Sequence, residues 1–352
     1  MVFSGSRGNY SYACTRVKAK KSFLLSRDTY SRLLNMDVHE IGRFLGESQY
    51  KEEVTKFAAR YSGASLIEVA VTRNLGRTYM DILGYTTGHL REMIAYYLQG
   101  WDVFNVKTIL RGKTSRTSEE EILDTLVPAG ALSEDYLKSL VSMGSIQEIM
   151  DSLSKIPSLR MTPELVREVV DTARLAPLED YLDKMRYYDL LKVVSGRDSA
   201  GQLLRQFIRR EIDVTNLKVL LKMKADKLPE EQIAKYLIPG GLEFGIDKLR
   251  SLASAEGLGP TLEEIERSKT FEVLKPAIDR FKEDHRLSSV TIGLDKANIA
   301  TSEKFAHQYP LSVLPVVNYL IQKKVEVDNI RAIARGKQAS LSNKIIEEIL
   351  VI

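Results

Sequence analysis

Residues 101–113 of the chain read WDVFNVKTILRGK, and related stretches follow at 212–224 (IDVTNLKVLLKMK) and 325–337 (VEVDNIRAIARGK). The first copy shares six of thirteen positions with each of the others, and the second and third share three, where average residue usage gives roughly one. The acidic second position is Asp102, Asp213 and Glu326, spaced by 111 and 113 residues. A period of this length predicts three copies of one domain rather than a short solenoid repeat.

Each copy predicts an amphipathic helix, because its apolar residues recur at i, i+3 and i+7 and share one face. The apolar positions are Val103, Val106 and Leu110, then Val214, Leu217 and Leu221, then Val327, Ile330 and Ala334. The acidic residue is expected to begin the helix as its N-cap, since a carboxylate accepts unpaired backbone N–H groups, with Glu326 capping less well than aspartate. An asparagine follows three residues later in every copy, at Asn105, Asn216 and Asn329.

Basic residues also occupy the same three positions in every copy. They are Lys107, Arg111 and Lys113, then Lys218, Lys222 and Lys224, then Arg331, Arg335 and Lys337. One interpretation is that these cations are solvated near helix C-termini, where the helix dipole favours them. The other is that they bind an acidic partner, because all nine positions are basic.

A second repeated block fixes the register of the units. LVPAG at 126–130 corresponds to LIPGG at 237–241, again 111 residues apart. We therefore predict boundaries near 128 and 239, which give units 1–128, 129–239 and 240–352. Alternation of period two is nearly absent, with 289–292 the one short candidate strand, and glycine and proline fall mostly at expected helix ends. The predicted fold class is all-α.

Composition places the chain among soluble globular proteins, with 352 residues, 44% hydrophobic and 28% charged. The net charge of +4, from 51 basic and 47 acidic residues, is too balanced for a general nucleic-acid binder. The single cysteine, Cys14, excludes an internal disulfide. No run of eighteen apolar residues occurs, and the start lacks a signal-peptide pattern. We expect a chain that does not itself cross a membrane.

Catalytic signatures are missing from the sequence. Residues 111–115 (RGKTS) resemble the end of a phosphate-binding loop, but Lys107 stands where that loop needs glycine. The four histidines are scattered without metal-ligand spacing, and Cys14 has no base nearby in the sequence. We therefore predict no catalytic, metal or cofactor site and no direct nucleotide binding. An all-α enzyme with a pocket built from distant residues stays an alternative.

Three stretches together resemble the C subunit of the archaeal and bacterial A/V-type ATP synthase, whose eukaryotic counterpart is the d subunit of the vacuolar ATPase. They are Tyr10 to Ser26 at the N-terminus, Tyr96 to Lys113, and Asn329 to Lys337. The resemblance covers essentially the whole chain, and the block DVxNVKTILRGK is its most specific part. The second copy departs from this pattern, with Met223 where Gly112 and Gly336 stand.

The resemblance implies a funnel-shaped, pseudo-threefold helical protein of the central rotor stalk. It implies that the chain is not an enzyme, because ATP is made or hydrolysed in the A and B subunits. The implied partners are the D and F subunits of the central shaft and the membrane proteolipid ring. The implied location is peripheral, on the cytoplasmic face of the cell membrane. A free-standing helical adaptor of another complex is the alternative interpretation.

Overall fold

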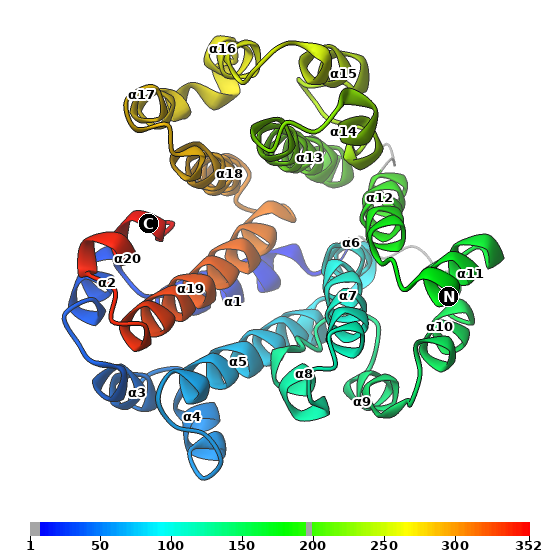
Figure 1. Cartoon of the computed structure of the whole chain (residues 1–352). Coiled ribbons are helices and arrows are strands. Elements are labelled where there is room, and N and C mark those ends of the chain that lie inside the picture. The colour runs from blue at the N-terminus through cyan, green and yellow to red at the C-terminus, as the bar shows by residue number, and fades with distance from the viewer. Residues whose placement is uncertain (1–7, 195–198) are drawn as a thin grey trace.

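The computed structural model describes residues 8–194 and 199–352, and the regular secondary structure in these residues is helical (Figure 1). No strand occurs in these residues, which confirms the predicted all-α class. The candidate strand 289–292 was a wrong prediction, because it lies inside α18 (Leu287–Gln308). Its apolar Val290 is buried on the inner face of that helix, so the short alternation reflects helical packing.

After a first helix, α1 (Tyr10–Lys21), the helices are grouped here by the copy of the repeated sequence to which they belong. The first repeat contains α2 (Arg27–Leu33), α3 (Val38–Gly46), α4 (Lys51–Phe57), α5 (Gly63–Tyr85), α6 (Gly88–Leu98), α7 (Gly100–Thr114) and α8 (Glu119–Thr125). The second contains α9 (Glu134–Ser142), α10 (Ile146–Ser154), α11 (Pro163–Thr172), α12 (Ala176–Val193), α13 (Ser199–Ala225) and α14 (Glu230–Tyr236). The third contains α15 (Ile246–Ser254), α16 (Gly259–Arg267), the 3-10 helix η1 (Lys269–Leu274), α17 (Lys275–Asp284), α18, α19 (Leu314–Gln338) and α20 (Asn343–Ile349).

The repeated sequence lies on α7, α13 and α19, which we call the repeat helices. Figure 1 shows them grouped around the centre of the molecule. In the first repeat α6 leads directly into α7, whereas α13 and α19 are each one long helix. Each repeat helix is preceded by a second long helix, which we call the partner helix: α5, α12 or α18.

The nine apolar positions of the repeated sequence are all buried, as predicted. The predicted helix start at the acidic position was wrong. Asp213 and Glu326 lie deep inside α13 and α19, and α7 begins at Gly100, before Asp102. The helices extend upstream because further buried apolar residues, such as Phe207 in α13, continue the same inner face.

The repeat helices end in the same way in all three copies. A non-glycine residue in the left-handed region follows each one: Arg116 (φ 57°), Lys227 (φ 57°) and Ser340 (φ 56°). The N–H of the next residue then bonds back into the last helical turn, as from Thr117 to the Gly112 carbonyl at 2.8 Å. This is the Schellman closure of a helix, and it turns the chain into the short α8, α14 or α20.

The hydrophobic cores do not follow the sequence repeats. One core joins α7 and α8 of the first repeat to α9–α12 of the second. Another joins the second half of α13 and α14 to α15–α18 of the third. Residues on both sides of positions 128 and 239 therefore share a core, so neighbouring repeats are packed into one another.

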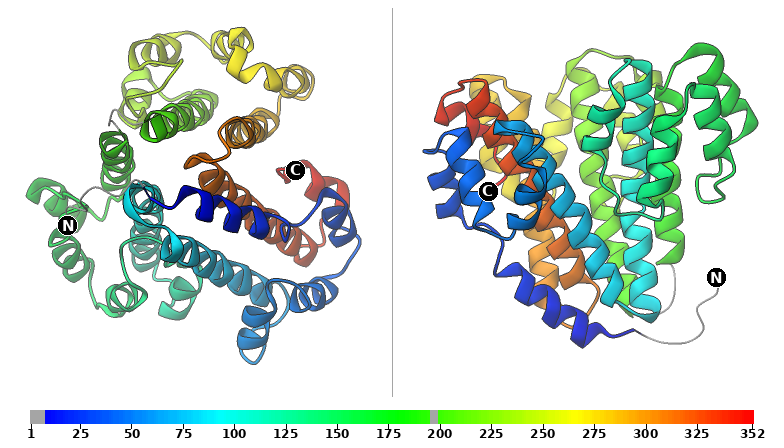
Figure 2. Two further views of the ribbon diagram at one scale, coloured as in Figure 1. Left: turned by 180° about the vertical axis from the view of Figure 1, so that it is seen from behind. Right: turned by 90° about the horizontal axis from the view of Figure 1, so that it is seen from below.

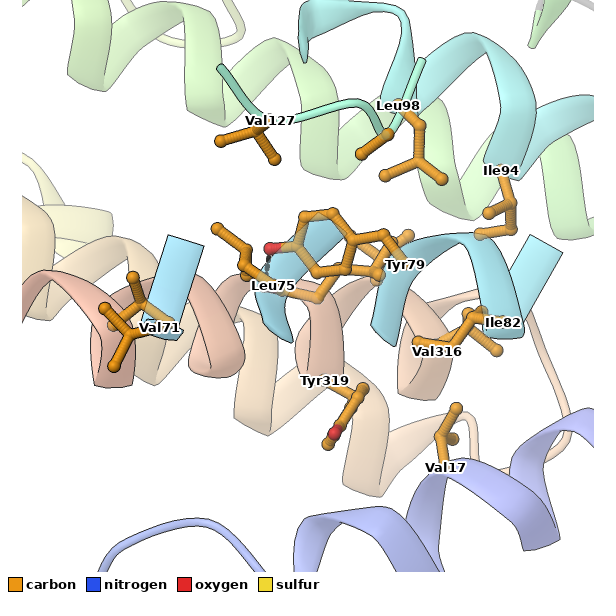
Figure 3. Close-up of a cluster of buried hydrophobic side chains, with 14 of the residues drawn as sticks. Val17, Val71, Leu75, Tyr79, Ile82, Ile94, Leu98, Val127, Val316 and Tyr319 are labelled. Atoms are coloured by element: carbon orange, nitrogen blue, oxygen red, sulfur yellow. Dashed lines mark hydrogen bonds between the residues drawn. The ribbon is translucent and has the colours of Figure 1, made fainter. Parts of the chain in front are cut away.

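The third core is the largest and links all three repeats. It joins α19 and α20 to α1–α5, and it also includes α6 and the first half of α13. Figure 3 shows side chains of α1, α5, α6 and α19 gathered in it, and the Tyr79 hydroxyl donates to the Leu320 carbonyl at 2.6 Å. The N-terminal half of α13 and the start of α7 thus meet α19 in this core, whereas the rest of α7 and of α13 pack into the other two cores; α19 belongs to the largest core along its whole length.

Helix α1 covers the convergent end of this core. Figure 2 shows it lying across α19 and α5 on the face seen from behind. Ala13 and Val17 are buried, and the Cys14 thiol lies 3.3 Å from the carbonyl oxygen of Ser312. Burial raises the pKa of this thiol to about 11, so the chain's one cysteine stays protonated and packed.

Candidate functional site: the central cavity and the joints between repeats

A cavity of about 440 Å³ lies between the three repeat helices. Its lining includes Trp101 and Phe104 of α7, Val214, Thr215 and Lys218 of α13, and Leu320, Ile321, Lys324, Val325 and Asp328 of α19. Several of these residues occupy corresponding positions of the repeated sequence: Phe104, Thr215 and Asp328 form one such set. The three repeat helices therefore each turn the corresponding face toward the cavity.

The wall of the cavity is built from packed aromatic rings and neutralised charges. The rings of Trp101 and Phe104 lie 5.4 Å apart, and Tyr79 is 5.8 Å from Trp101. The Glu211 carboxylate accepts hydrogen bonds from the hydroxyls of Tyr97 at 3.2 Å and Tyr187 at 3.1 Å. This carboxylate is therefore held as an acceptor within a fixed polar network.

No reactive grouping stands out in this wall. Across residues 8–194 and 199–352, no cluster of three or more His, Cys, Asp or Glu side chains is placed to hold a metal ion. The cavity carboxylates of Asp295 and Asp328 pair with Lys218 and Lys324.

The acidic residue of the repeated sequence joins one repeat to the start of the next. We call these three contact regions the joints: the first lies at Asp102, the second at Asp213 and the third at Glu326. The Asp102 carboxylate accepts hydrogen bonds from the backbone N–H groups of Ala131 (2.8 Å) and Leu132 (2.9 Å). A Cβ on Gly130 would lie 2.1 Å from this carboxylate, so only glycine fits there. Burial raises the pKa of Asp102 to about 6, against the opposing effect of the two backbone hydrogen bonds.

Asp213 repeats this arrangement at the second joint. It accepts hydrogen bonds from the backbone N–H groups of Leu242 (3.0 Å), Glu243 (2.9 Å) and Phe244 (3.2 Å). A Cβ on Gly241 would again lie 2.1 Å from the carboxylate. Burial raises the pKa of Asp213, while the backbone donors lower it. Both aspartates thus cap the backbone of the following repeat instead of their own helix.

Glu326 makes the corresponding contact with the beginning of the chain. Its carboxylate accepts a hydrogen bond from the backbone N–H of Leu25 at 2.5 Å. Leu25 precedes Ser26, which caps α2, just as Leu132 precedes Ser133, which caps α9. The three acids therefore link the first repeat to the second, the second to the third, and the third back to the first.

Among the residues that the structure describes, the joint at Glu326 contains a buried ion pair that the other two joints lack. Lys323 is completely buried and its Nζ lies 2.8 Å from the Glu326 carboxylate. The Tyr50 hydroxyl donates to the same carboxylate at 2.5 Å and lies 2.8 Å from Lys323. Burial lowers the pKa of Lys323, opposed by Glu326, and burial and Glu326 raise the pKa of Tyr50. At this joint the glutamate carboxylate is thus neutralised by a lysine and accepts a further hydrogen bond from a tyrosine hydroxyl.

The asparagine of the repeated sequence closes a backbone clamp in every copy. Asn105 accepts from the Val127 N–H at 2.8 Å and donates to the Val127 carbonyl at 2.7 Å. Asn216 does the same with Ile238, at 2.8 Å for both bonds. Asn329 repeats it with Val351 at 2.9 and 3.0 Å. The side-chain amide takes the place of a peptide group, and it holds the segment that follows α8, α14 or α20 against the repeat helix.

The first two basic positions mainly reach the partner helix of the next repeat. Lys107 pairs with Asp183 of α12 at 2.5 Å, and Lys218 pairs with Asp295 of α18. Arg331 donates to Thr72 of α5. At the second position, Arg111 forms two 2.6 Å hydrogen bonds with Glu179, and Arg335 pairs with Glu68. These cations fasten each repeat helix to the repeat that follows it.

The remaining basic residues complete the set of nine. Lys113 pairs with Glu119 at 3.2 Å, Lys337 donates to Asn343 at 2.7 Å, and Lys224 donates to the Leu252 and Ala255 carbonyls at 2.5 Å. Lys222 is exposed and forms no ion pair within the described residues, because Thr291 stands where Glu68 and Glu179 stand in the other repeats. Eight of the nine residues therefore have a polar partner inside the chain.

Comparison with known proteins decides the family. The family model described as "ATP synthase (C/AC39) subunit" matches residues 13–349. The chain belongs to this family. It is 37% identical to the C subunit of the A-type ATP synthase of Methanococcoides burtonii over 350 residues, which cover 99% of this chain and 96% of the relative. It is 36% identical over 352 residues to that of Archaeoglobus fulgidus, with 100% and 99% covered. That of Haloferax volcanii is 34% identical, with 98% of each chain covered.

Membership of the family makes this chain a subunit of an ATP synthase, which implies that it assembles with other subunits. The resemblance expected from the repeated sequence is confirmed. In the described residues, no helix combines the length and apolar character needed to cross a bilayer. The acid, the asparagine and the first cation of the repeated sequence each serve a joint between the repeats of this ATP synthase subunit.

Proposed function

We propose that the chain is a non-catalytic rotor subunit of the central stalk of an A/V-type ATP synthase. It couples the D and F subunits of the central shaft to the membrane proteolipid ring and transmits torque during ion-driven ATP synthesis or hydrolysis-driven ion transport. It sits peripherally on the cytoplasmic face of the cell membrane. The units 1–128, 129–239 and 240–352 form a pseudo-threefold funnel whose open end receives the shaft.

The observation that carries this proposal is the closed cycle of joints around the central cavity. A subunit that transmits torque has to resist twisting between its parts. Here each joint combines a buried acid, a double asparagine clamp and at least one cation, and all three share cores with their neighbours. Close-packed helices fixed by satisfied buried polar groups deform little.

We propose that the nine basic residues of the repeated sequence include a surface that binds an acidic partner, formed by those that remain exposed. The side chains of Arg111 and Arg335 stay 64% and 67% exposed although they are paired, and Lys222 is exposed and has no ion pair in the described chain. Such groups attract an acidic surface through long-range electrostatics, with a strong salt dependence. Lys222 is the member with most freedom to bind a partner.

Cross-linking tests whether the shaft occupies the cavity. Cysteine is placed singly at Phe104, Thr215 and Asp328, the corresponding cavity positions on the three repeat helices. The native Cys14 is buried, so the new thiol is the reactive one. In native membranes, all three variants should cross-link to the shaft, whereas Ser254→Cys, exposed on α15, should not. Pull-down that recovers neither the shaft nor the proteolipid ring would instead favour the free-standing adaptor.

A charge-swap series tests the cations. Reversing Arg111, Lys222 and Arg335 together to glutamate should weaken assembly, most strongly at low salt. Because Arg111 and Arg335 also hold joints, a matched variant adds Glu179→Arg and Glu68→Arg to restore those ion pairs. Assembly that stays weak in the matched variant supports partner binding. Assembly that returns to normal assigns these residues to the joints alone.

A further inference from the structure

A second cavity, of about 550 Å³, lies beside α18 and shares part of its wall with the central cavity. We call it the α18 groove. Figure 1 shows α18 between α17 and α19, and the groove is bounded by residues of α18, α19, η1 and the start of α2. Ile299 and Val325 line both cavities and therefore separate them. The groove has the size of a small-molecule site, since such cavities usually measure about 300–1,000 Å³.

Most of the lining of the α18 groove is apolar. Leu24, Ile299 and Val325 are only partly buried there, and Val273 of η1 is 55% exposed. Covering these side chains with an apolar ligand is favourable, because it removes them from water. Tyr30 is the one aromatic residue of the described lining, and it is buried, so it offers little ring surface for stacking on a base. The lining therefore suits an alkyl chain better than a nucleotide.

Two cations of the groove lack an acidic partner. Arg27 is exposed at the start of α2 and Lys296 is exposed on α18, and neither forms an ion pair or a side-chain hydrogen bond within residues 8–194 and 199–352. Burial, and then the neighbouring charges of Arg27 and Arg280, lower the pKa of Lys296. Three like charges from three helices thus lie close together, and an anion placed among them would reduce their repulsion.

The acidic residues of the groove are already neutralised. Glu303 pairs with Lys21 at 3.3 Å, and Glu326 pairs with the buried Lys323 at 2.8 Å. These carboxylates therefore do not compensate Arg27 and Lys296, and an anionic group is the complement that the groove lacks.

Positive charge continues along the same face of α18. Lys296, Ala300 and Lys304 recur every four residues and are all exposed, so they form one stripe of the helix. A further hollow of about 580 Å³ adjoins the groove at Ala300. One acid, Glu272, lines this hollow. Three cations line it without an ion pair in the described residues: Arg210, Lys269 and Lys304. The field over this face therefore favours the approach of an anion.

We propose that the α18 groove binds an anionic amphiphile, a molecule with one alkyl chain and a phosphate or carboxylate head group. The head group lies between Arg27 and Lys296, and the alkyl chain covers Leu24, Ile299 and Val273. An inorganic anion would leave this apolar surface in water, and an uncharged chain would leave the two cations unpaired. The inference concerns the α18 groove alone and does not depend on the central-stalk proposal.

Dodecyl phosphate is the probe, and isothermal titration calorimetry of the full chain below the critical micelle concentration measures its binding. One saturable site is expected. Ethyl phosphate, which has the same head group, should bind about a hundredfold more weakly, because it lacks the chain that buries apolar surface. Dodecyltrimethylammonium, which has the same chain and a positive head group, should bind about tenfold more weakly. Dodecanoate separates a carboxylate source from a phosphate source, and a saturable site for either anion supports the proposal.

Variants place the site in the groove. Lys296→Glu should weaken binding of dodecyl phosphate about tenfold. Ala300→Trp, at an exposed position that lines the groove, should weaken binding without a change of charge. The matched control is Lys344→Glu, at an exposed lysine of α20 outside the lining, which should bind as the parent does. Far-UV circular dichroism checks that each variant is folded.

Four results would overturn the proposal. Equal affinity for dodecyl phosphate and ethyl phosphate assigns the cations to a free phosphate or a nucleotide. Equal affinity for the anionic and cationic dodecyl compounds, or unchanged affinity of Lys296→Glu, removes the cations from the site. Binding of many molecules without saturation shows only a detergent effect. None of these results bears on the shaft or the proteolipid ring, so the cross-linking test of the central cavity is read separately.

Discussion

The Glu326 carboxylate accepts a hydrogen bond at 2.5 Å from the backbone N–H of Leu25, a residue 301 positions earlier in the chain. The two preceding joints use aspartate and a linker that continues directly into the next repeat. The third joint has no such linker, and it combines a longer acid with Lys323, Tyr50 and Gln49. The joint without a covalent linker is thus the one with the most extensive buried polar network.

Removing one charge of this network should be costly. Glu326→Ala leaves the fully buried Lys323 ammonium without its counter-ion, and we expect a loss of about 3–5 kcal/mol in the free energy of unfolding. The double variant Glu326→Ala with Lys323→Met removes both charges and should recover more than half of this loss. Urea unfolding measures both. Equal stability of the single and double variants would show that the unpaired charge is not the cause.

The asparagine clamps predict a local change in hydrogen exchange. Asn105→Ala removes two hydrogen bonds and leaves the N–H and carbonyl of buried Val127 unsatisfied. We expect a loss of about 2–4 kcal/mol and faster exchange of the Val127 amide. Asn35→Ala, at an exposed asparagine, is the control and should change stability little. Unaltered protection at Val127 would contradict the clamp.

The buried Asp102 predicts a pH dependence of stability. Its pKa is raised from 3.8 to about 6 in the folded protein, so between these values the folded chain holds a proton that the unfolded chain releases. The free energy of unfolding should therefore fall by about 1–3 kcal/mol as pH rises through this window. Asp102→Asn should remove the part of the slope that Asp102 contributes, while the part from Asp213, whose pKa is also raised, remains. Unfolding of both proteins from pH 4 to 7 measures it, and parallel curves would disprove it.

The second joint lacks one ion pair, and a single substitution should supply it. Thr291→Glu places a carboxylate at the position of Glu68 and Glu179, opposite Lys222. Because the pair would be exposed, we expect a gain of only about 0.2–1 kcal/mol, reduced by salt. Adding Lys222→Ala to Thr291→Glu should cancel the gain. A gain that survives in this double variant would have another origin.

Much of the architecture could be predicted because a pattern that recurs in three copies of one sequence can be recognised without a structure. The apolar spacing of Val103, Val106 and Leu110 identified a buried helical face, and the buried positions agree. The constant distance between Asn105 and the LVPAG block, copied at Asn216, was a usable signal for a contact between them. The predicted boundaries near 128 and 239 follow from the sequence register and stay a prediction.

The acidic residues show why the rest could not be predicted. From the local sequence, Asp102 is predicted to be an N-cap. The sequence does not show which backbone N–H groups lie near its carboxylate in space. The helix continues past it, and its carboxylate meets the Ala131 and Leu132 N–H groups of the next repeat. Likewise the first two cations of each copy, Lys222 excepted, find partners on a neighbouring repeat that lie far along the chain, as for Arg111 and Glu179. Only the packing of neighbouring repeats reveals these pairs.

The largest core has a consequence for the order in which the protein is made. The Tyr79 hydroxyl of α5 bonds to the Leu320 carbonyl of α19, and the Leu25 N–H bonds to Glu326, so the N-terminal helices lack these contacts until nearly the whole chain has been translated. The core formed by α7–α12 is complete long before that. The middle of the chain can therefore fold first, and the apolar surface that α5 and its neighbours turn toward α19 stays uncovered until the last long helix arrives.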